Sequence, residues 1–138
     1  MNALYKAEVT ATGGRNGHVE STDGVINMDV RMPKELGGAG GAYTNPEQLF
    51  AAGYAACFDS ALNLVARQLK INVKDTKVTA QVGIGQLPDG GFGLSASLSV
   101  HIPNVEQEVA QQLIEQAHKV CPYSNATRGN IEVSLQLV

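Results

Sequence analysis

The chain has 138 residues, of which 43% are hydrophobic and 17% charged, a composition typical of one globular domain covering residues 1–138. Its net charge is −3 and its basic residues are scattered, which excludes the usual electrostatic signature of a nucleic-acid-binding protein. No unbroken apolar run approaches the roughly 18 residues of a membrane span, and no apolar signal core is present, so we expect a soluble cytoplasmic protein.

The first part of the chain predicts short strands joined by tight turns. Alternating apolar and polar residues favour three strands, over residues 5–11, 18–22 and 26–32. Arg15 lies in the turn between the first two, flanked by glycines. Four glycines in residues 36–42 prevent any regular element there and predict a mobile loop.

The clearest helix of the sequence begins after this loop. Asn45 is a favourable N-cap, Pro46 suits the first helical position, and the pattern continues to about Lys70. Between residues 49 and 65 the only charge is Asp59, and apolar or small residues occupy every face. A helix that is apolar all round is buried, so this one belongs to the centre of the fold or to a large subunit interface.

The remaining elements predict an α+β fold of antiparallel strands around one buried helix and one amphipathic helix. Two strands, over residues 78–84 and 94–102, form a hairpin, and a last strand follows over 131–137. The amphipathic helix covers residues 105–120 and ends at the Cys121-Pro122 dipeptide. Its apolar stripe is expected to comprise Val109, Leu113, Ala117 and Val120.

Two cysteines, Cys57 and Cys121, are the residues with the strongest chemical potential. They are not in a CxxC pair, which excludes a thioredoxin motif and a cysteine-rich zinc finger. In a reducing cytosol they are either inert core residues or a working thiol pair. His118 precedes Cys121 by three residues, so the two side chains could share a metal ion. Together with Cys57 they supply three ligands, fewer than the four of a structural zinc site, so we expect no metal.

A reactive Cys57 needs a cation, because its apolar neighbours raise the pKa of the thiol and the helix dipole is weak three turns into a helix. Arg15 is the candidate, with Glu47 as its bidentate carboxylate partner. The ordinary alternatives are an exposed loop arginine and a helix-start carboxylate. Glu47 precedes Cys57 by ten residues, roughly 15 Å along a helix. If both serve one site, Arg15 and Glu47 therefore come from a partner chain. Cys121, at a helix C-terminus, suits a resolving thiol or a core residue.

Three segments together resemble the organic hydroperoxide resistance (Ohr) family, a branch of the OsmC superfamily. They are Gly13-Gly14-Arg15, the block from Thr44 to Phe58 around the first cysteine, and the block from Cys121 to Asn130 that begins Cys-Pro-Tyr-Ser-Asn. The resemblance runs from end to end, and the two cysteine blocks are its most specific parts.

The resemblance implies a thiol peroxidase that reduces organic hydroperoxides, including fatty-acid hydroperoxides, to alcohols. It implies an intertwined homodimer, in which antiparallel sheets wrap around a long buried central helix and the active sites lie at the subunit interface. In this sequence the attacking cysteine matches Cys57 and the resolving cysteine matches Cys121. The family's arginine and glutamate match Arg15 and Glu47.

The resemblance further implies a dihydrolipoyl reductant carried by a lipoylated protein, with no metal or bound cofactor. From their position near the first cysteine, Phe50, Tyr54 and Phe58 are expected to line an apolar channel for the substrate. The glycine loop is a candidate lid. Two other functions stay open at this point: a peroxide-responsive redox sensor of the OsmC type, and a carrier of hydrophobic ligands.

Overall fold

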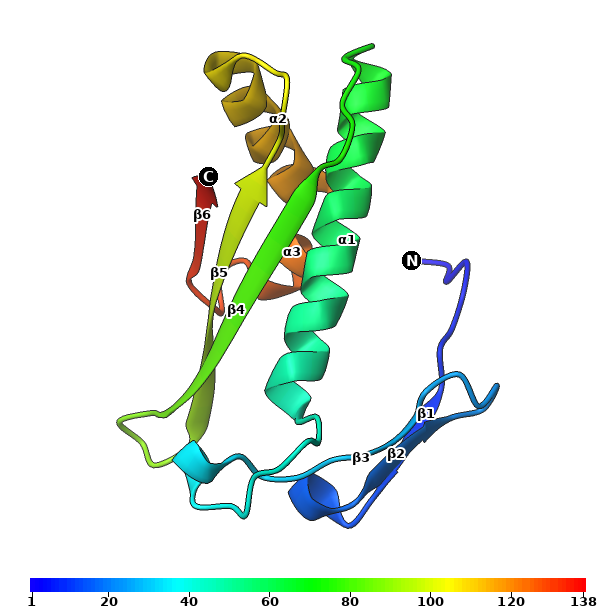
Figure 1. Cartoon of the computed structure of the whole chain (residues 1–138), viewed down its shortest axis with the longest axis vertical. Helices are drawn as coiled ribbons and strands as arrows, with labels where there is room; N and C mark the ends of the chain where they lie inside the picture. The colour runs from blue at the N-terminus through cyan, green and yellow to red at the C-terminus, as the bar shows by residue number, and fades with distance from the viewer. The chain divides into compact units, whose positions relative to one another are not determined.

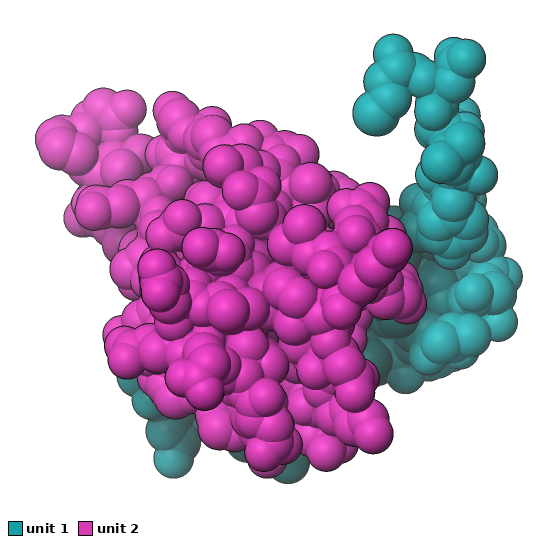
Figure 2. Space-filling model, turned by 90° about the horizontal axis from the view of Figure 1, so that it is seen from above, with its two compact units in different colours: residues 1–49 teal, residues 50–138 magenta.

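The computed structural model describes all residues from 1 to 138, and the contacts among them divide the chain into two compact units (Figure 2). The first unit comprises residues 1–49 and the second comprises residues 50–138. The sequence predicts that residues 1–138 form a single domain. Whether the two units combine into one domain stays a prediction.

The first unit contains a three-stranded antiparallel sheet (Figure 1). Its strands are β1 (Val9–Thr12), β2 (His18–Ser21) and β3 (Asn27–Asp29). All three expected strands are present, but the first begins four residues later than predicted. β2 ends before the turn at Asp23, so residues 5–8 find no partner strand beyond one bond, from the Thr22 amide to the Glu8 carbonyl. A segment with alternating apolar and polar residues forms a β-strand only where a neighbouring strand is present to pair with it.

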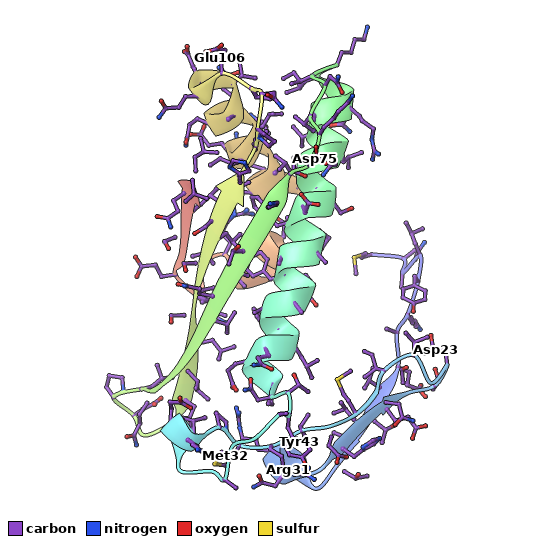
Figure 3. All side chains as sticks on the ribbon, in the orientation of Figure 1. Asp23, Arg31, Met32, Tyr43, Asp75 and Glu106 are labelled. Carbon is purple, nitrogen blue, oxygen red and sulfur yellow. The ribbon has the colours of Figure 1, made fainter.

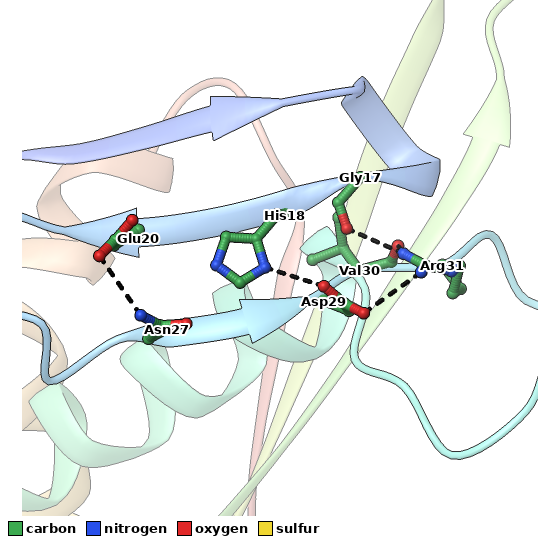
Figure 4. Close-up of polar contacts among 7 residues, drawn as sticks. All are labelled: Gly17, His18, Glu20, Asn27, Asp29, Val30 and Arg31. Carbon is green, nitrogen blue, oxygen red and sulfur yellow. Dashed lines mark hydrogen bonds and ion pairs between the residues drawn. The ribbon is translucent and has the colours of Figure 1, made fainter.

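A continuous set of polar contacts joins β2 to the end of β3 (Figure 4). His18 Nδ1 lies 2.8 Å from Asp29 Oδ1, and this hydrogen bond lowers the pKa of Asp29. Arg31 donates to the second oxygen of Asp29 at 3.2 Å and to the carbonyls of Gly17 and Val30 at 2.9 and 2.7 Å. These bonds fix the path of the chain as it leaves the sheet.

The glycine-rich segment is a loop, as predicted, preceded by a short 3₁₀ turn over Lys34–Leu36. Met32 and Tyr43, both labelled in Figure 3, stand on either side of it in the chain. Gly41 has φ +107, a conformation that favours glycine. At Gly38 an added Cβ would collide with the carbonyl of Met32. The loop therefore requires glycine for both its conformation and its close backbone approach.

Helix α1 (Pro46–Gln68) confirms the predicted helix and its cap. The Asn45 side chain accepts a hydrogen bond of 2.9 Å from the Gln48 amide, which satisfies one of the free donors of the first turn. The helix ends where Lys70 adopts a left-handed conformation, with φ +57.

Only one face of α1 is buried within the chain, whereas the sequence predicts burial all round. The residues on its other face include Ala52, Ala56 and Leu64, which are exposed. By length and composition alone α1 is apolar enough to cross a membrane, a test that the core helix of a soluble protein also passes. The buried residues of α1 are Tyr54, Phe58, Ala61, Leu62, Val65 and Ala66.

The second unit contains a sheet in the order β4-β5-β6, whose strands are β4 (Lys77–Gln86), β5 (Phe92–His101) and β6 (Val133–Leu137). The predicted β4–β5 hairpin is confirmed. The expectation of purely antiparallel strands is wrong, because β6 pairs with β5 in parallel. The chain makes the long crossover that a parallel pair needs through α2 (Gln107–Val120) and α3 (Pro122–Thr127) (Figure 1).

The core of the second unit draws side chains from α1, α2 and alternate residues of β5, so both helices cover one face of the sheet. The predicted apolar stripe of α2 is displaced. Val120 is 45% exposed and Val109 is only partly buried, since the buried positions follow the helical spacing from Ala110. The buried residues of α2 are Ala110, Leu113, Ile114 and Ala117.

Helix α3 is absent from the sequence prediction, which ends the amphipathic helix at Cys121-Pro122 and places no element there. The same proline that stops α2 occupies the first position of α3. The two helices are thus separated by Cys121 alone.

We expect Asn45→Ala to lower the free energy of unfolding by about 1 kcal/mol, because the α1 cap loses its acceptor. Chemical denaturation measures this change. Asn72→Ala is the control, since Asn72 is exposed and lies outside any helix or strand. Equal small effects of the two substitutions would contradict the assigned cap.

Candidate functional site

The structure brings Cys57 and Cys121 together although 64 residues separate them in the sequence. Cys57 lies on α1, and Cys121 lies at the junction of α2 and α3. Both cysteines are free, and Cys121 is close enough to Cys57 to raise the pKa of the Cys57 thiol. Cys121 is completely buried in the core, whereas Cys57 retains some exposed surface. This arrangement places a second thiol where it can react with any oxidised form of the first.

The environment of Cys57 does not activate its thiol within this chain. Burial raises the pKa of Cys57, and the neighbouring Cys121 raises it further. The backbone of Tyr123 lies next to Cys57 and opposes this shift by lowering the pKa of the thiol. No cationic side chain of this chain opposes the rise in the pKa of Cys57, so its surroundings favour the protonated thiol.

A buried polar network lies beside the two cysteines. The Tyr54 hydroxyl is 3.0 Å from Ser124 Oγ and 3.4 Å from Thr127 Oγ1, and His118 Nδ1 is 2.9 Å from Ser124 Oγ. The Tyr54 ring also stacks on Tyr123, with centroids 5.6 Å apart and planes at 29°. Sequence reasoning treats Tyr54 only as a channel residue and gives Ser124 and Thr127 no role, because α3 is not foreseen.

His118 is neutral at pH 7. Its burial and, to a smaller extent, the positive charge of Arg128 lower the pKa of His118. Arg128 also donates a hydrogen bond of 2.6 Å to the His118 carbonyl, which joins α2 to the end of α3. No group of three or more His, Cys, Asp or Glu side chains is arranged to hold a metal ion.

Arg15 and Glu47 form a bidentate ion pair in the first unit. The two guanidinium nitrogens donate to the two carboxylate oxygens at 2.8 and 2.7 Å. Arg15 is 32% exposed and Glu47 is 12% exposed, so the carboxylate is the better shielded partner. The hydrogen bonds from Arg15 lower the pKa of Glu47, and those to Glu47 raise the pKa of Arg15.

The turn that presents Arg15 depends on its flanking glycines. Gly13 adopts a left-handed conformation with φ +73, and Arg15 sits in the 3₁₀ turn that follows. An added Cβ on Gly17 would collide with the carbonyl of Thr12 at the other end of the turn. Glu47 lies in the first turn of α1, close to the Asn45 cap. A capped helix and a glycine-bounded turn thus fix both members of the ion pair.

The three residues expected to line a substrate channel differ in their surroundings. Tyr54 and Phe58 are completely buried, but Phe50 is only partly buried. Phe50 meets the rings of Tyr54 and Tyr123 edge-on, with centroid distances of 6.2 and 5.8 Å. Of the three, Phe50 therefore has the most surface left for an apolar ligand, and the channel itself stays a prediction.

Residues 38–136 match the family described as OsmC-like protein. The chain is 53% identical over 135 residues to the organic hydroperoxide resistance protein of Xanthomonas axonopodis pv. citri, covering 97% of this chain and 94% of that protein. It is 49% identical to the organic hydroperoxide resistance protein OhrB of Bacillus subtilis, covering 98% of each. The crystal structure of an organic hydroperoxide resistance protein from Elizabethkingia anophelis superposes with a TM-score of 0.95 at 64% identity, covering 99% of this chain and 98% of that one. The resemblance and the α+β fold class predicted from the sequence are both confirmed.

We expect Glu47→Gln to lower the free energy of unfolding by about 1 kcal/mol at pH 7, since the pair is partly screened by solvent. The pKa of Glu47 is lower in the folded chain than in the unfolded one. Its contribution is therefore fully present above the unfolded value of about 4.3 and is lost as the pH falls through the folded pKa.

Denaturation of both proteins between pH 7 and pH 3 measures this effect, and the difference between them should shrink on acidification. Glu108→Gln is the control, because Glu108 also lies in the first turn of a helix but is exposed. A difference that is constant across this range would contradict the assigned ion pair.

Proposed function

The chain belongs to the OsmC-like family, in its organic hydroperoxide resistance branch, and on that basis we propose that it reduces organic hydroperoxides to alcohols by thiol chemistry. The coarse function, a role in organic hydroperoxide resistance, follows from the named relatives. The observation that carries the finer one is the proximity of Cys57 and Cys121, which are distant in sequence and close enough in the fold for Cys121 to raise the pKa of Cys57.

The proposed reaction begins at the more accessible sulfur. The Cys57 thiolate attacks the distal oxygen of the hydroperoxide, the O–O bond breaks, and the alkoxide leaves and gains a proton to become the alcohol. Cys57 is thereby oxidised to sulfenic acid. Cys121 then forms a disulfide with Cys57, and the sulfenic oxygen leaves as water.

The thiolate needs a positive charge that its own surroundings lack, since burial and Cys121 both raise the pKa of Cys57. Arg15, held by Glu47, is the proposed source. Such a cation lowers the pKa of the thiol and stabilises negative charge as the O–O bond breaks. Glu47 precedes Cys57 by ten residues on α1, about 15 Å along the axis, so we assign the activating pair to a second copy of the chain.

The surface of the single chain supports a homodimer. Among residues 1–49 only Val30 is buried, and a three-stranded sheet with no core of its own needs a covering surface. On α1 the small residues Ala52 and Ala56 are exposed and permit close helix approach, and Leu64 beside them is 42% exposed. A second copy that covers both surfaces would also complete the thiol site.

An apolar substrate and a dithiol reductant suit the remaining features. Phe50 offers a partly buried apolar ring on the helix that carries Cys57. Burial of an alkyl chain contributes about 0.8 kcal/mol per CH₂, which favours alkyl hydroperoxides over hydrogen peroxide. For recycling we propose a dihydrolipoyl group on a lipoylated protein in the cytoplasm. Its thiolate attacks Cys57, because Cys121 is completely buried, and Cys121 leaves as the thiolate. The second dihydrolipoyl thiol then attacks the mixed disulfide, which releases Cys57 as a thiolate and leaves the lipoyl disulfide.

The reduced protein, treated with one equivalent of an alkyl hydroperoxide, should lose two hydrogens. Intact mass and a cysteine-mapped digest measure this, and a linked Cys57–Cys121 peptide is the expected product. Two free thiols and an unchanged mass would overturn the proposed peroxidase and favour a hydrophobic-ligand carrier. Oxidation that a dithiol fails to reverse would favour a redox sensor.

We expect the two cysteine substitutions to have unequal effects. Cys57→Ser should abolish peroxide consumption, because the attacking sulfur is gone. Cys121→Ser should consume one equivalent and then accumulate sulfenic or sulfinic acid at Cys57. Peroxide consumption and peptide mass spectrometry measure both outcomes. Equal partial losses would show that the two thiols do not have separate attacking and resolving roles.

Arg15→Ala should raise the pKa of Cys57, so the initial oxidation rate should rise more steeply with pH than in the unaltered protein. Co-expression of Arg15→Ala chains with Cys57→Ser chains tests the source of the cation. A dimer of one copy of each contains one complete site only if Arg15 acts on the Cys57 of the other chain. Purified mixed dimers should therefore recover about half of the normal activity, one site of two. Mixed dimers without activity would assign both groups to the same chain.

A further inference from the structure

We propose that Tyr54, Ser124 and His118 form a positioning network that holds Cys121 against Cys57 while the disulfide forms. The inference rests on the proposed peroxidase function and deepens it. These side chains take no part in the chemistry of the proposed cycle, yet they are the polar groups buried next to its two sulfurs.

Tyr54 links the helix of one cysteine to the segment of the other. It lies on α1, three residues before Cys57, and its hydroxyl contacts Ser124 and Thr127 on α3 at 3.0 and 3.4 Å. α3 begins directly after Cys121. Tyr54 and Ser124 are completely buried and Thr127 is 3% exposed, so water does not compete for these bonds.

Tyr123 connects the contact between Tyr54 and α3 to the Cys57 sulfur. Its ring stacks on the Tyr54 ring at 5.6 Å, and its backbone is close enough to Cys57 to lower the pKa of the thiol. The backbone around Tyr123 is also constrained. Ser124 is held by the Tyr54 hydroxyl, and Cys121, two residues before Tyr123, by the turn into α3. The placement of the Cys121–Tyr123 backbone over Cys57 thus depends on one tyrosine.

One arrangement of protons satisfies every contact between the side chains of the network. The Thr127 hydroxyl donates to the Tyr123 carbonyl at 3.0 Å, so its oxygen accepts from Tyr54. The Tyr54 oxygen then accepts from Ser124, and Ser124 accepts from the Nδ1–H of His118. Each group of this series donates to the next one, from His118 to the Tyr123 carbonyl. The loss of any hydroxyl therefore leaves a buried polar group without its hydrogen-bond partner.

His118, on α2, is the first donor in this series of hydrogen bonds. Its ring lies 6.5 Å from that of Phe58, and its carbonyl accepts a hydrogen bond from Arg128. The ring is therefore held between the core and the end of α3. Because Nδ1 is the donor to Ser124, an amide nitrogen at the same position can replace it.

Positioning matters most in the second chemical step. The Cys121 sulfur attacks the sulfur of the Cys57 sulfenic acid, the S–S bond forms, the S–O bond breaks, and the oxygen leaves as water with the released proton. If Cys121 is displaced, a second hydroperoxide molecule oxidises Cys57 to sulfinic acid instead. A displacement of about 1 Å at a reacting centre costs up to 100-fold in rate.

Tyr54→Phe in the full-length protein tests the network, because it removes the hydroxyl and keeps the stacked ring. We expect disulfide formation to slow about 10- to 100-fold, with the sulfinic form accumulating under a small excess of alkyl hydroperoxide. Rapid-quench alkylation followed by mass spectrometry separates the sulfenic, sulfinic and disulfide forms. Disulfide formation at the unaltered rate would overturn the proposal.

Thr76→Val is the matched control. Thr76 also donates a hydroxyl hydrogen bond to α1, to Asp59 at 2.6 Å. Asp59 is two residues from Cys57, so it projects from the opposite side of the helix. Thr76→Val should lower the thermal midpoint to a similar extent without slowing disulfide formation. An equal slowing by Thr76→Val would show that general destabilisation, and not the Tyr54 network, controls the step.

Three further variants keep the test decisive if Tyr54→Phe does not fold. Ser124→Ala should slow disulfide formation as Tyr54→Phe does, and His118→Ala should do so as well. His118→Asn should restore the rate, because its amide keeps a donor near the Nδ1 position. Failure of this rescue would remove His118 from the network. A protein whose Cys57 is never oxidised would refute the peroxidase itself, a result distinct from oxidation with unaltered disulfide formation.

Discussion

The packing of α3 against α1 is the contact on which the thiol site depends. The two cysteines are far apart in sequence. Cys57 lies on α1 and Cys121 lies at the start of α3, so they meet only because these two helices pack together. The parallel crossover from β5 through α2 and α3 to β6 returns the chain to the face of the sheet that α1 covers. Tyr54 then locks α3 in place with both its ring and its hydroxyl. The local geometry of two sulfurs is thus a product of the topology of the whole second unit.

Burial serves the two sulfurs differently. For Cys121, complete burial restricts its reaction to the partner that the fold supplies, which suits a resolving thiol. For Cys57, burial raises the pKa of the thiol and opposes the thiolate that peroxide chemistry needs. The fold offers a partial remedy in the Tyr123 amide, and the proposed remedy is the Arg15–Glu47 pair. The site therefore needs both apolar surroundings, which favour an alkyl substrate, and a charged group, which activates the sulfur. The proposed site obtains the two from separate segments.

Much of the fold could be predicted from the sequence, because its signals are local. The Asn45 cap, the α1 span, the β4–β5 hairpin and the glycine loop each follow from residues that are adjacent in the chain. The errors concern partners. Residues 5–8 have the alternation of a strand but no neighbour, and β6 pairs in parallel because of the helices that precede it.

The candidate site divides in the same way. The resemblance and the residue types point to both cysteines and to the Arg15–Glu47 pair, and the structure adds their contacts. The network of Ser124 and His118 could not be found from spacing, since it requires α3, whose start signal is the same proline that ends α2. A residue that both stops one helix and starts another is ambiguous until the fold decides.

The N-terminal unit carries a thermodynamic consequence of its own. Ordering a residue costs roughly 1–2 kcal/mol of backbone entropy, and a segment of 49 residues that buries only Val30 recovers little of it within itself. Its folding has to draw on apolar surface supplied from elsewhere. Where that surface belongs to a second copy, the thermal midpoint rises with protein concentration, and dilution alone loosens the segment that carries Arg15. The cell's expression level would then help to set the fraction of the protein that is competent to react.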